Sequence, residues 1–131
     1  MYKKVLQKLN YKAINNGDIP VSCIIVKDNK IISKAYNTKY KSNDSLGHAE
    51  INAIKKASKK LHTTNLMDCE MYVTLKPCKM CEEIIKESRL KKVNYYLERN
   101  KEVNNIIDYK KIDDIDNFFE KELSKFFKNK R

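Results

Sequence analysis

Glycine, proline and tryptophan are scarce in this chain, whose 131 residues include two glycines, two prolines and no tryptophan. Glycine and proline are the strongest local signals of turns and loops, so the sequence offers few such signals. No repeat, low-complexity tract or linker stands out. A chain of this length can form one domain with a hydrophobic core but not two, and we expect a single domain over residues 1–131.

Long apolar runs are absent as well. No stretch approaches the 18 apolar residues that indicate a transmembrane helix. Residues 1–5 lack the apolar run that begins a secretory signal. We therefore expect a cytoplasmic protein that has no membrane partner.

The chain has only four cysteines. Cys78 and Cys81 form a C-x-x-C pair, which in a reducing compartment indicates metal or redox chemistry rather than a disulfide. Cys23 and Cys69 lie inside apolar runs, and we expect both to be inert core residues because free cysteine is so often buried.

Acidic residues are outnumbered by basic ones, 17 against 28, which gives a formal net charge of +11. A charge of this size is typical of proteins that bind a polyanion such as nucleic acid. Lysine codons favoured by an A+T-rich genome, or a solvated coat of lysines, would produce the same charge. The charge alone therefore leaves both interpretations open.

The spacing of apolar residues predicts helices that alternate with strands. We expect helices over residues 2–15, 48–61, 78–88 and 114–128, and strands over residues 19–27, 30–36, 69–75 and 93–97. A polar loop is expected over residues 37–47, and residues 106–112 are ambiguous. Such alternation favours an α/β fold, with a partly parallel sheet covered by helices on both faces.

Two short segments, residues 48–50 and 77–81, contain residues of the types that bind zinc. A structural zinc site usually has four protein ligands, whereas a catalytic site has three and leaves a position for water. His48, Cys78 and Cys81 supply three, so we predict a catalytic Zn²⁺ site. Each segment is expected to begin a helix, so two positive helix N-termini can converge on one metal.

Glu50 follows His48 by two residues and is left free of the metal. A carboxylate in that position can lie beside a zinc-bound water and act as general acid and base. The order H-x-E followed by P-C-x-x-C is the signature of zinc deaminases. A lone C-x-x-C would more often be half of a zinc ribbon or a redox pair, but the conjunction of the two segments favours deamination.

The sequence resembles the bacterial tRNA-specific adenosine deaminases, within the cytidine deaminase-like superfamily. The similar segments are residues 18–21, 36–37, 47–53, 71–81, 88–90 and 123–128. The resemblance covers about residues 2–97 and the last helix. It implies a three-layer α/β/α fold around a five-stranded mixed sheet, and a homodimer.

The resemblance also implies an activity, the hydrolytic deamination of adenosine to inosine at the wobble position of a tRNA anticodon. It implies that zinc is bound by His48, Cys78 and Cys81 and that Glu50 moves the protons. Residues 1–131 would then form a single zinc-dependent deaminase domain whose partner is the anticodon stem-loop.

By the same resemblance, Asn37 contacts the flipped base or its ribose. Pro20 and Val21 match the family motif beside the substrate. The backbone N–H groups of Ala49 and Cys78 are expected to serve the base and the developing oxyanion. These residues form the predicted substrate-binding set.

The predicted RNA contacts lie near the end of the chain. Phe126, Phe127 and Lys128 match a family helix that contacts the anticodon stem-loop. Tyr36 and Tyr40 are expected near the pocket, where their rings could stack on unpaired bases. Because adjacent residues cannot share one helix face, we expect one of the two phenylalanines to be partly exposed.

The sequence also departs from the family pattern. Lys76 stands where the family usually has glutamate, and Ser22-Cys23 replaces the usual Gly-Ala pair. The glycine-rich segment that follows the fourth strand in the family is missing, so residues 98–113 do not align.

Two other functions remain open from the sequence. One is an enzyme of the same fold that acts on a free base, nucleoside or nucleotide, such as a cytosine compound or guanine. The other is a non-catalytic zinc module that only binds RNA. The presence of Glu50 argues against the second, because such a module needs no proton carrier.

Overall fold

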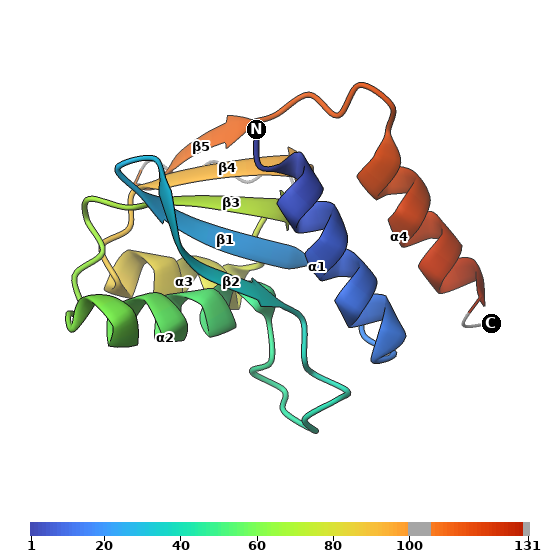
Figure 1. Ribbon diagram of the computed structural model, residues 1–131, viewed down its shortest axis with the longest axis horizontal. Coiled ribbons are helices and arrows are strands. Elements are labelled where there is room, and N and C mark those ends of the chain that lie inside the picture. Colours follow the sequence, from blue (N-terminus) through green and yellow to red (C-terminus); the bar gives the residue numbers. More distant parts are fainter. Residues whose placement is uncertain (100–105, 130–131) are drawn as a thin grey trace.

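The computed structural model describes residues 1–99 and 106–129 (Figure 1). Its elements are α1 (Lys3–Asn15), β1 (Ser22–Lys27), β2 (Lys30–Tyr36), α2 (Ala49–Leu61), β3 (Glu70–Leu75), α3 (Lys79–Glu87), β4 (Lys92–Leu97), β5 (Asp108–Lys111) and α4 (Phe118–Asn129). The predicted alternation is confirmed, and the ambiguous stretch contains β5. Part of the unaligned stretch, residues 100–105, lies outside the described residues. Within them, no helix combines the length and the apolar character needed to cross a bilayer.

The five strands form one mixed sheet in the order β2-β1-β3-β4-β5. β1 runs antiparallel to both of its neighbours, whereas β3, β4 and β5 are parallel to one another. β1 and β2 are joined by a tight turn in which Asp28 and Asn29 adopt φ values of 50° and 62°. Asparagine and aspartate tolerate this left-handed conformation, which hairpin turns require. The predicted five-stranded mixed sheet is therefore confirmed.

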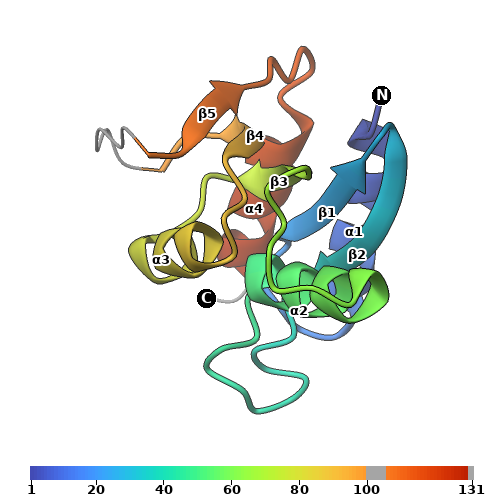
Figure 2. The ribbon, with the colours of Figure 1, turned by 90° about the vertical axis from the view of Figure 1, so that its left-hand side faces the viewer.

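Helices cover both faces of the sheet, as Figures 1 and 2 show: α2 and α3 lie on one face, and α1 and α4 lie on the other. β1, an interior strand of the sheet, shows why both faces are apolar. Cys23 and Ile25 pack on the α2–α3 side, while Ile24 and Val26 pack on the α1–α4 side. Successive strand residues point to opposite faces, so a strand covered on both faces has a continuous apolar run.

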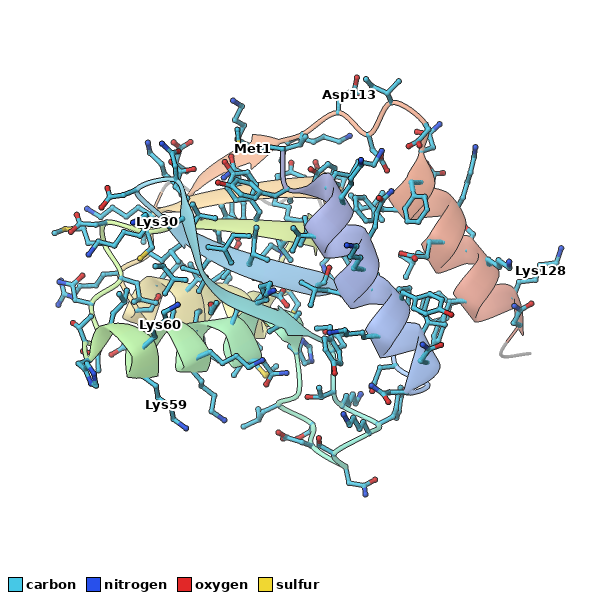
Figure 3. All side chains as sticks on the ribbon, viewed as in Figure 1. Met1, Lys30, Lys59, Lys60, Asp113 and Lys128 are labelled. Carbon is cyan, nitrogen blue, oxygen red and sulfur yellow. The ribbon has the colours of Figure 1, made fainter. Side chains whose placement is uncertain are left out.

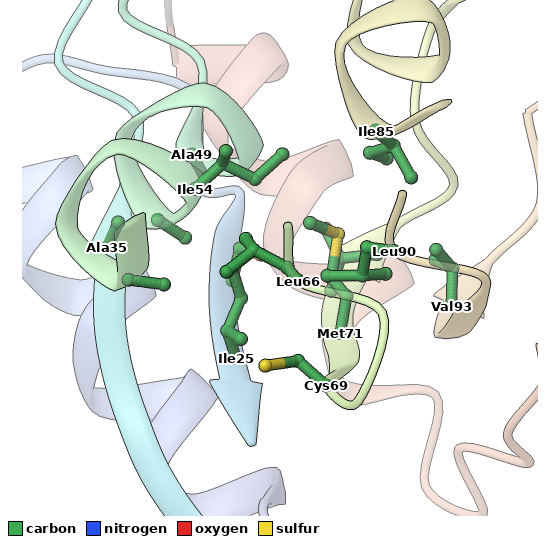
Figure 4. Packing of buried hydrophobic residues seen from close by; sticks show 14 of the residues in the cluster. Ile25, Ala35, Ala49, Ile54, Leu66, Cys69, Met71, Ile85, Leu90 and Val93 are labelled. Carbon is green, nitrogen blue, oxygen red and sulfur yellow. The ribbon is translucent and has the colours of Figure 1, made fainter. Parts of the chain in front are cut away.

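The core on the α2–α3 side is the larger of the two, and Figure 4 shows part of it. Ile25, Met71 and Ile85 bring β1, β3 and α3 into it, and each is fully buried. Cys23 and Cys69 are buried as expected, with 0% and 3% of their surface exposed. This densely packed layer carries the two helices that begin at the zinc-type residues.

The last helix begins later than the predicted residue 114. Its first residue is Phe118, because Asn117 has a left-handed φ of 53° and ends the preceding turn. Asp114 accepts a hydrogen bond from the backbone N–H of Phe119 at 2.9 Å and forms an ion pair with Lys3 at 2.6 Å. The predicted start was therefore wrong, because a tertiary ion pair fixes residues 114–117 as a turn.

Candidate active site

The two zinc-type segments meet at one edge of the sheet, because each begins a helix there. His48 is the N-cap residue of α2, and Cys78 is the N-cap residue of α3. Both have extended backbone conformations, and neither side chain caps its own helix. The side chains are therefore free to turn toward one another, as the sequence predicted.

Gly47 allows the loop before His48 to close tightly. A Cβ at this position would lie 2.8 Å from the backbone N of Lys39 and 2.8 Å from the carbonyl carbon of Thr38. The Thr38 N–H donates to the Gly47 carbonyl at 2.8 Å. Because only glycine fits this approach, Gly47 fixes where the chain enters α2.

The three predicted ligand residues lie together. The Nδ1 atom of His48 is 3.5 Å from the Sγ of Cys81 and 3.9 Å from the Sγ of Cys78, and all three donor atoms lie within 4.8 Å of one another. A tetrahedral zinc, with Zn–S of about 2.3 Å and Zn–N of about 2.0–2.1 Å, places sulfur and nitrogen about 3.6 Å apart. The arrangement therefore fits a zinc ion with three protein ligands.

The electrostatics of the triad also suit a bound cation. Burial, followed by Lys39 and Arg99, lowers the pKa of His48, which favours the neutral imidazole that binds metal. Burial, followed by neighbouring Glu50, raises the pKa of the Cys81 thiol. A thiolate in such surroundings needs a nearby positive charge, and a zinc ion supplies one.

Glu50 occupies the first turn of α2 and is 4% exposed. Burial raises the pKa of its carboxyl group above the ordinary value, while its own backbone N–H, Arg99 and the Cys81 thiol act in the opposite direction. A raised pKa moves a carboxyl group toward the range in which it serves as both general acid and general base. Its position beside Cys81, but outside the triad, suits the predicted proton carrier.

The triad opens into a pocket of about 370 Å³. His48 and Glu50 lie in this pocket together with residues from several other segments. The remaining walls come from five other segments: Asp18, Ile19 and Val21 before β1, Asn37, Lys39 and Tyr40 in the loop, Leu75 of β3, Arg99 after β4, and Leu123 and Phe127 of α4. Six segments, far apart in the sequence, thus enclose one volume.

The predicted substrate-binding residues divide into two groups. Asn37 and Val21 line the pocket, whereas Pro20 and Ala49 are buried and do not belong to its walls. The backbone N–H of Ala49 donates to Asn37 Oδ1 at 2.8 Å. This bond fixes the orientation of the Asn37 side chain and leaves its Nδ2 as the donor available to a ligand.

Some of the predicted RNA-contacting residues lie at the pocket and others do not. Phe127 lines the pocket and is 49% exposed, while Phe126 lies on a neighbouring face of α4 and does not belong to the pocket walls. Their rings are 5.5 Å apart, with an angle of 80° between the planes. Lys128 is exposed near the end of α4, and it is labelled in Figure 3. Tyr40 lies at the pocket as expected, but Tyr36 does not.

Sequence reasoning missed Arg99 as a pocket residue. Its Nε donates to the backbone carbonyl of Lys76 at 2.9 Å, and its charge affects both His48 and Glu50. No local motif marks Arg99, which falls in the stretch that does not align with the family. Only the pairing of β3 with β4 brings it beside the pocket.

Asp18 has a structural role that the family motif did not specify. Its side chain is fully buried, and its carboxylate accepts the backbone N–H groups of Tyr40 at 2.7 Å and Lys41 at 3.2 Å. Because these bonds connect the segment before β1 to the loop at residues 37–47, Asp18 positions one wall of the pocket.

The contacts of Lys76 explain why a lysine can stand where the family usually has glutamate. Its ammonium group lies 3.4 Å from Glu98 and over the rings of Tyr109 and Tyr95, at 4.8 and 5.5 Å from their centroids. The side chain therefore faces β4 and β5 rather than the pocket. It joins the ends of three strands immediately before Pro77 and Cys78.

The fold and the site together define a zinc-dependent deaminase domain. A model of the cytidine and deoxycytidylate deaminase zinc-binding region matches residues 1–97. The matched region includes the whole metal triad and Glu50.

Curated relatives narrow this class. The tRNA-specific adenosine deaminase of Buchnera aphidicola subsp. Schizaphis graminum is 36% identical over 144 residues, covering 99% of this chain and 94% of the relative. That of Aquifex aeolicus is 45% identical over 92 residues, covering 70% of this chain but only 61% of the relative. The chain therefore belongs to the tRNA-specific adenosine deaminases of the cytidine and deoxycytidylate deaminase family.

Solved structures agree on the fold. A chain from a study of A-to-I editing by tRNA:A34 deaminases superposes with a TM-score of 0.77 at 22% identity, covering 85% of this chain and 96% of that one. A guanine deaminase from Bacillus subtilis superposes with a TM-score of 0.67 at 38% identity, covering 75% of this chain and 65% of that one. The same architecture thus occurs in proteins named for different substrates.

Proposed function

We propose that this protein deaminates the wobble adenosine of a tRNA anticodon, converting adenosine and water into inosine and ammonia. The names of the Buchnera and Aquifex relatives support the substrate. The zinc-type triad and the buried Glu50 support the chemistry.

The observation that carries the proposal is the composition of the pocket rim. Lys39 and Arg99 bring two cations to the pocket, and Tyr40 and Phe127 bring two half-exposed aromatic rings. Cations and aromatic rings together are typical of sites for unpaired nucleic acid, where bases stack on rings and phosphates contact cations. A pocket for a free base needs no such rim.

Each residue of the site has a distinct role in this proposal. His48 Nδ1 and the two thiolates, of Cys78 and Cys81, would hold a zinc ion. When bound there, the ion would lower the pKa of a water ligand to about 7 and so make a nucleophile available at neutral pH. Glu50 accepts one proton from the attacking water and passes it to ring nitrogen N1. It then takes the proton of the hydroxyl group newly bonded to C6 and delivers it to the amino group, which leaves as ammonia while the C6 carbonyl of inosine forms. Asn37 orients the base or its ribose through its Nδ2.

The burial of Glu50 supports this role in two ways. A low-dielectric environment raises its pKa toward the working pH, and it excludes competing solvent protons. Such a group contributes typically 10²–10⁴-fold to the rate of a proton transfer. The anticodon stem-loop as partner, the homodimer and the cytoplasmic location remain predictions from family resemblance.

Guanine deamination is the second candidate, because the Bacillus subtilis guanine deaminase is 38% identical to this chain. The two candidates differ in what surrounds the reacting ring. A free base needs only the inner pocket, whereas an anticodon loop also needs the rim and α4.

The test is a panel of substrates for zinc-loaded protein. The panel contains an anticodon stem-loop with adenosine at the wobble position, the same loop with that adenosine moved by one position, free adenosine, cytidine and guanine. We expect inosine in the first RNA and little or none in the second. Turnover of guanine without inosine in either RNA would contradict the proposal.

A paired variant separates catalysis from simple RNA binding. Glu50→Gln should bind both zinc and the stem-loop but form inosine about 10²–10⁴-fold more slowly than the wild type. If the intact protein bound the stem-loop and deaminated no member of the panel, a non-catalytic RNA-binding module would be favoured instead.

A further inference from the structure

Helix α3 carries one of the three metal-ligand residues and begins at another, yet it has few apolar anchors. Two of its residues, Cys81 and Ile85, are buried. Ile85 packs the second half of the helix into the larger core. The first turn buries only Cys81, which is itself a metal ligand. Apolar packing alone therefore does not fix where this turn lies.

Glu82 connects the first turn of α3 to the edge of the sheet. Its backbone N–H donates to the carbonyl of Cys78 at 2.8 Å, which closes the turn. Its carboxylate accepts a hydrogen bond from the hydroxyl of Tyr109, on edge strand β5, at 2.9 Å. Figure 2 shows α3 below the half of the sheet that β4 and β5 form. One side-chain hydrogen bond thus joins the turn that contains the metal ligands to a strand 27 residues further along the chain.

The ring of Tyr109 is held from two sides. The ammonium group of Lys76 lies 4.8 Å from the ring centroid, and the ring of Tyr95 packs edge-on at 5.9 Å with an angle of 81°. A cation over an aromatic face is attracted by the negative face of the ring. The ends of β3 and β4 therefore fix the ring of Tyr109, while α3 receives its hydroxyl.

Two departures from the family pattern meet at this tyrosine. β5 lies in the stretch that does not align with the family, and Lys76 replaces the usual glutamate. A carboxylate at position 76 would face the negative side of the ring and would lie close to Glu98, which pairs with Lys76 at 3.4 Å. A cation suits this place and a carboxylate does not, so Lys76 and Tyr109 belong to one arrangement.

The hydroxyl of Tyr109 remains a donor over the whole neutral range. Burial, followed by the hydrogen bond to Glu82, raises the pKa of Tyr109 above its ordinary value of 10.0. Glu50 and Cys81 act in the same direction, so the hydroxyl lies within range of the charges of the metal site. The contact between β5 and α3 is therefore a constant feature of the site.

We propose that Tyr109 is a positioning residue of the metal site, which holds the first turn of α3 through Glu82. His48 comes from α2, so its spacing from the two cysteines depends on where this turn lies. Hydrogen-bonded partners outside the ligand set orient the ligands, and their loss typically changes metal affinity or activity 10- to 100-fold. The inference concerns the metal site alone and does not depend on the identity of the substrate.

The first test removes the hydroxyl and keeps the ring. Tyr109→Phe should raise the Kd for zinc, measured by competition with a chelating dye, about 10- to 100-fold. With cobalt in place of zinc, the visible absorption bands report the geometry of the ligands, and they should shift in metal-saturated Tyr109→Phe. A residue that only stabilised the fold would change the unfolding transition and leave the cobalt spectrum of the folded protein as it is.

Tyr95→Phe is the matched control. Tyr95 also donates its hydroxyl to a carboxylate, that of Glu98 at 2.7 Å, but this bond does not reach α3. The zinc affinity and the cobalt spectrum of Tyr95→Phe should be those of the wild type. Equal changes in Tyr95→Phe and Tyr109→Phe would mean that any loss in this layer disturbs the metal, which would overturn the inference.

A double-mutant cycle tests whether Tyr109 acts through Glu82. In the Glu82→Ala background, Tyr109→Phe should raise the Kd for zinc no further, because the acceptor of its hydroxyl is already gone. In the Glu82→Gln background an acceptor remains, and Tyr109→Phe should still raise the Kd. Additive effects of Tyr109→Phe and Glu82→Ala would show that Tyr109 acts by another route and would contradict the proposal.

The readouts separate this inference from the proposed function. Absence of inosine would overturn the function, whereas the role of Tyr109 is judged by metal affinity and by the cobalt spectrum. That role is overturned if Tyr109→Phe keeps both the zinc affinity and the cobalt spectrum of the wild type.

Discussion

The two faces of the sheet differ in how they are held together. On the α2–α3 face, 17 buried hydrophobic residues form one cluster, and the helices begin at the metal triad. On the α1–α4 face, the corresponding cluster has six, and polar contacts such as Lys3–Asp114 and Asn10–Glu122 complete the packing. These counts refer to residues 1–99 and 106–129.

This difference assigns catalysis to the α2–α3 face and substrate selection to the α1–α4 face. A metal site needs donor atoms held to within about 0.5 Å, which a densely packed face supplies. A surface that receives an RNA loop needs exposed rings and cations instead, and a sparsely packed helix such as α4 presents them. The zinc pocket lies where the two faces meet, because Phe127 of α4 and Glu50 of α2 both line it.

The largest expected effect is on catalysis, at the α2–α3 face. Glu50→Gln should lower kcat for inosine formation about 10²–10⁴-fold, because it removes the proton carrier but keeps the shape of the side chain. Zinc content, measured by metal analysis, should stay at one ion per chain. Loss of zinc together with activity would instead make Glu50 a structural residue.

The second prediction compares the two cores directly. Phe119 is 1% exposed and packs against Tyr96 at 4.9 Å between ring centroids. Phe119→Ala should lower the free energy of unfolding by about 3–5 kcal/mol. It should weaken RNA turnover through displacement of α4, while zinc remains bound. Denaturant unfolding and metal analysis measure the two effects.

The matched variant on the other face is Ile85→Ala, one helical turn after Cys81. This substitution should lower the free energy of unfolding by about 2–5 kcal/mol, and it should weaken zinc binding as well. If Phe119→Ala released zinc as readily as Ile85→Ala, the division between the two faces would be wrong. Phe119→Leu serves as a milder change should the alanine variant fail to fold.

The third prediction concerns the contacts of Glu98, the residue that follows β4. The hydroxyl of Tyr95, at 2.7 Å, followed by Lys76, holds the pKa of Glu98 below its ordinary value of 4.5. A lowered pKa means that this carboxylate stabilises the fold above its ordinary pKa and that the contribution is lost as the pH falls. Glu98→Gln should therefore be less stable than the wild type at pH 7.

The pH dependence tests this assignment. The stability difference between wild type and Glu98→Gln should shrink as the pH is lowered from 5 through the lowered pKa of Glu98. Glu83→Gln is the control, because Glu83 is largely exposed and pairs only with Lys86 at 3.2 Å among the described residues. A stability difference for Glu98→Gln that stays constant with pH would contradict the contacts of Glu98 with Tyr95 and Lys76.

The smallest effect is expected at the α1–α4 contact. Burial raises the pKa of Glu122, and the Oδ1 of fully buried Asn10 has no hydrogen-bond partner among the described residues. Glu122→Gln keeps an acceptor for Asn10 Nδ2 and adds a donor for Asn10 Oδ1. An unsatisfied buried polar atom costs about 1–3 kcal/mol of folding stability. The free energy of unfolding of the variant should therefore be about 1 kcal/mol higher than that of the wild type at pH 7.

The same substitution has a definite pH signature. A carboxyl group with a raised pKa destabilises the fold once the pH exceeds that pKa, because ionisation is then more costly in the folded state. The advantage of Glu122→Gln should therefore decrease as the pH falls below the pKa of Glu122. Thermal unfolding at pH 4 and pH 7 measures it, and an equal or larger gain at pH 4 would contradict the assignment.

Local signals in the sequence predicted the metal site and the elements that carry it well. The hairpin at residues 22–36 and the helix starts at His48 and Cys78 follow from apolar spacing and turn residues close to them in the chain. The metal triad and Glu50 form a motif whose spacing reflects these helix starts. Neighbours in sequence determine these features, so the chain displays them directly.

Features that depend on distant neighbours were not predictable in the same way. β5 is an edge strand in which only Tyr109 is partly buried, so its pattern of residues resembles a loop. The start of α4 depends on Lys3, more than 100 residues away in the chain. Arg99 reaches the pocket only because β4 pairs with β3, and Lys76 finds its partners on β4 and β5.

The central claim is tested most directly by inosine formation at the wobble adenosine of an anticodon stem-loop, followed by mass spectrometry while zinc is removed and restored. We predict that the rate follows zinc content, reaches its maximum at one zinc per chain and is about 10²–10⁴-fold lower in Glu50→Gln at the same zinc content. Inosine formed equally without zinc, or turnover of guanine alone, would contradict it.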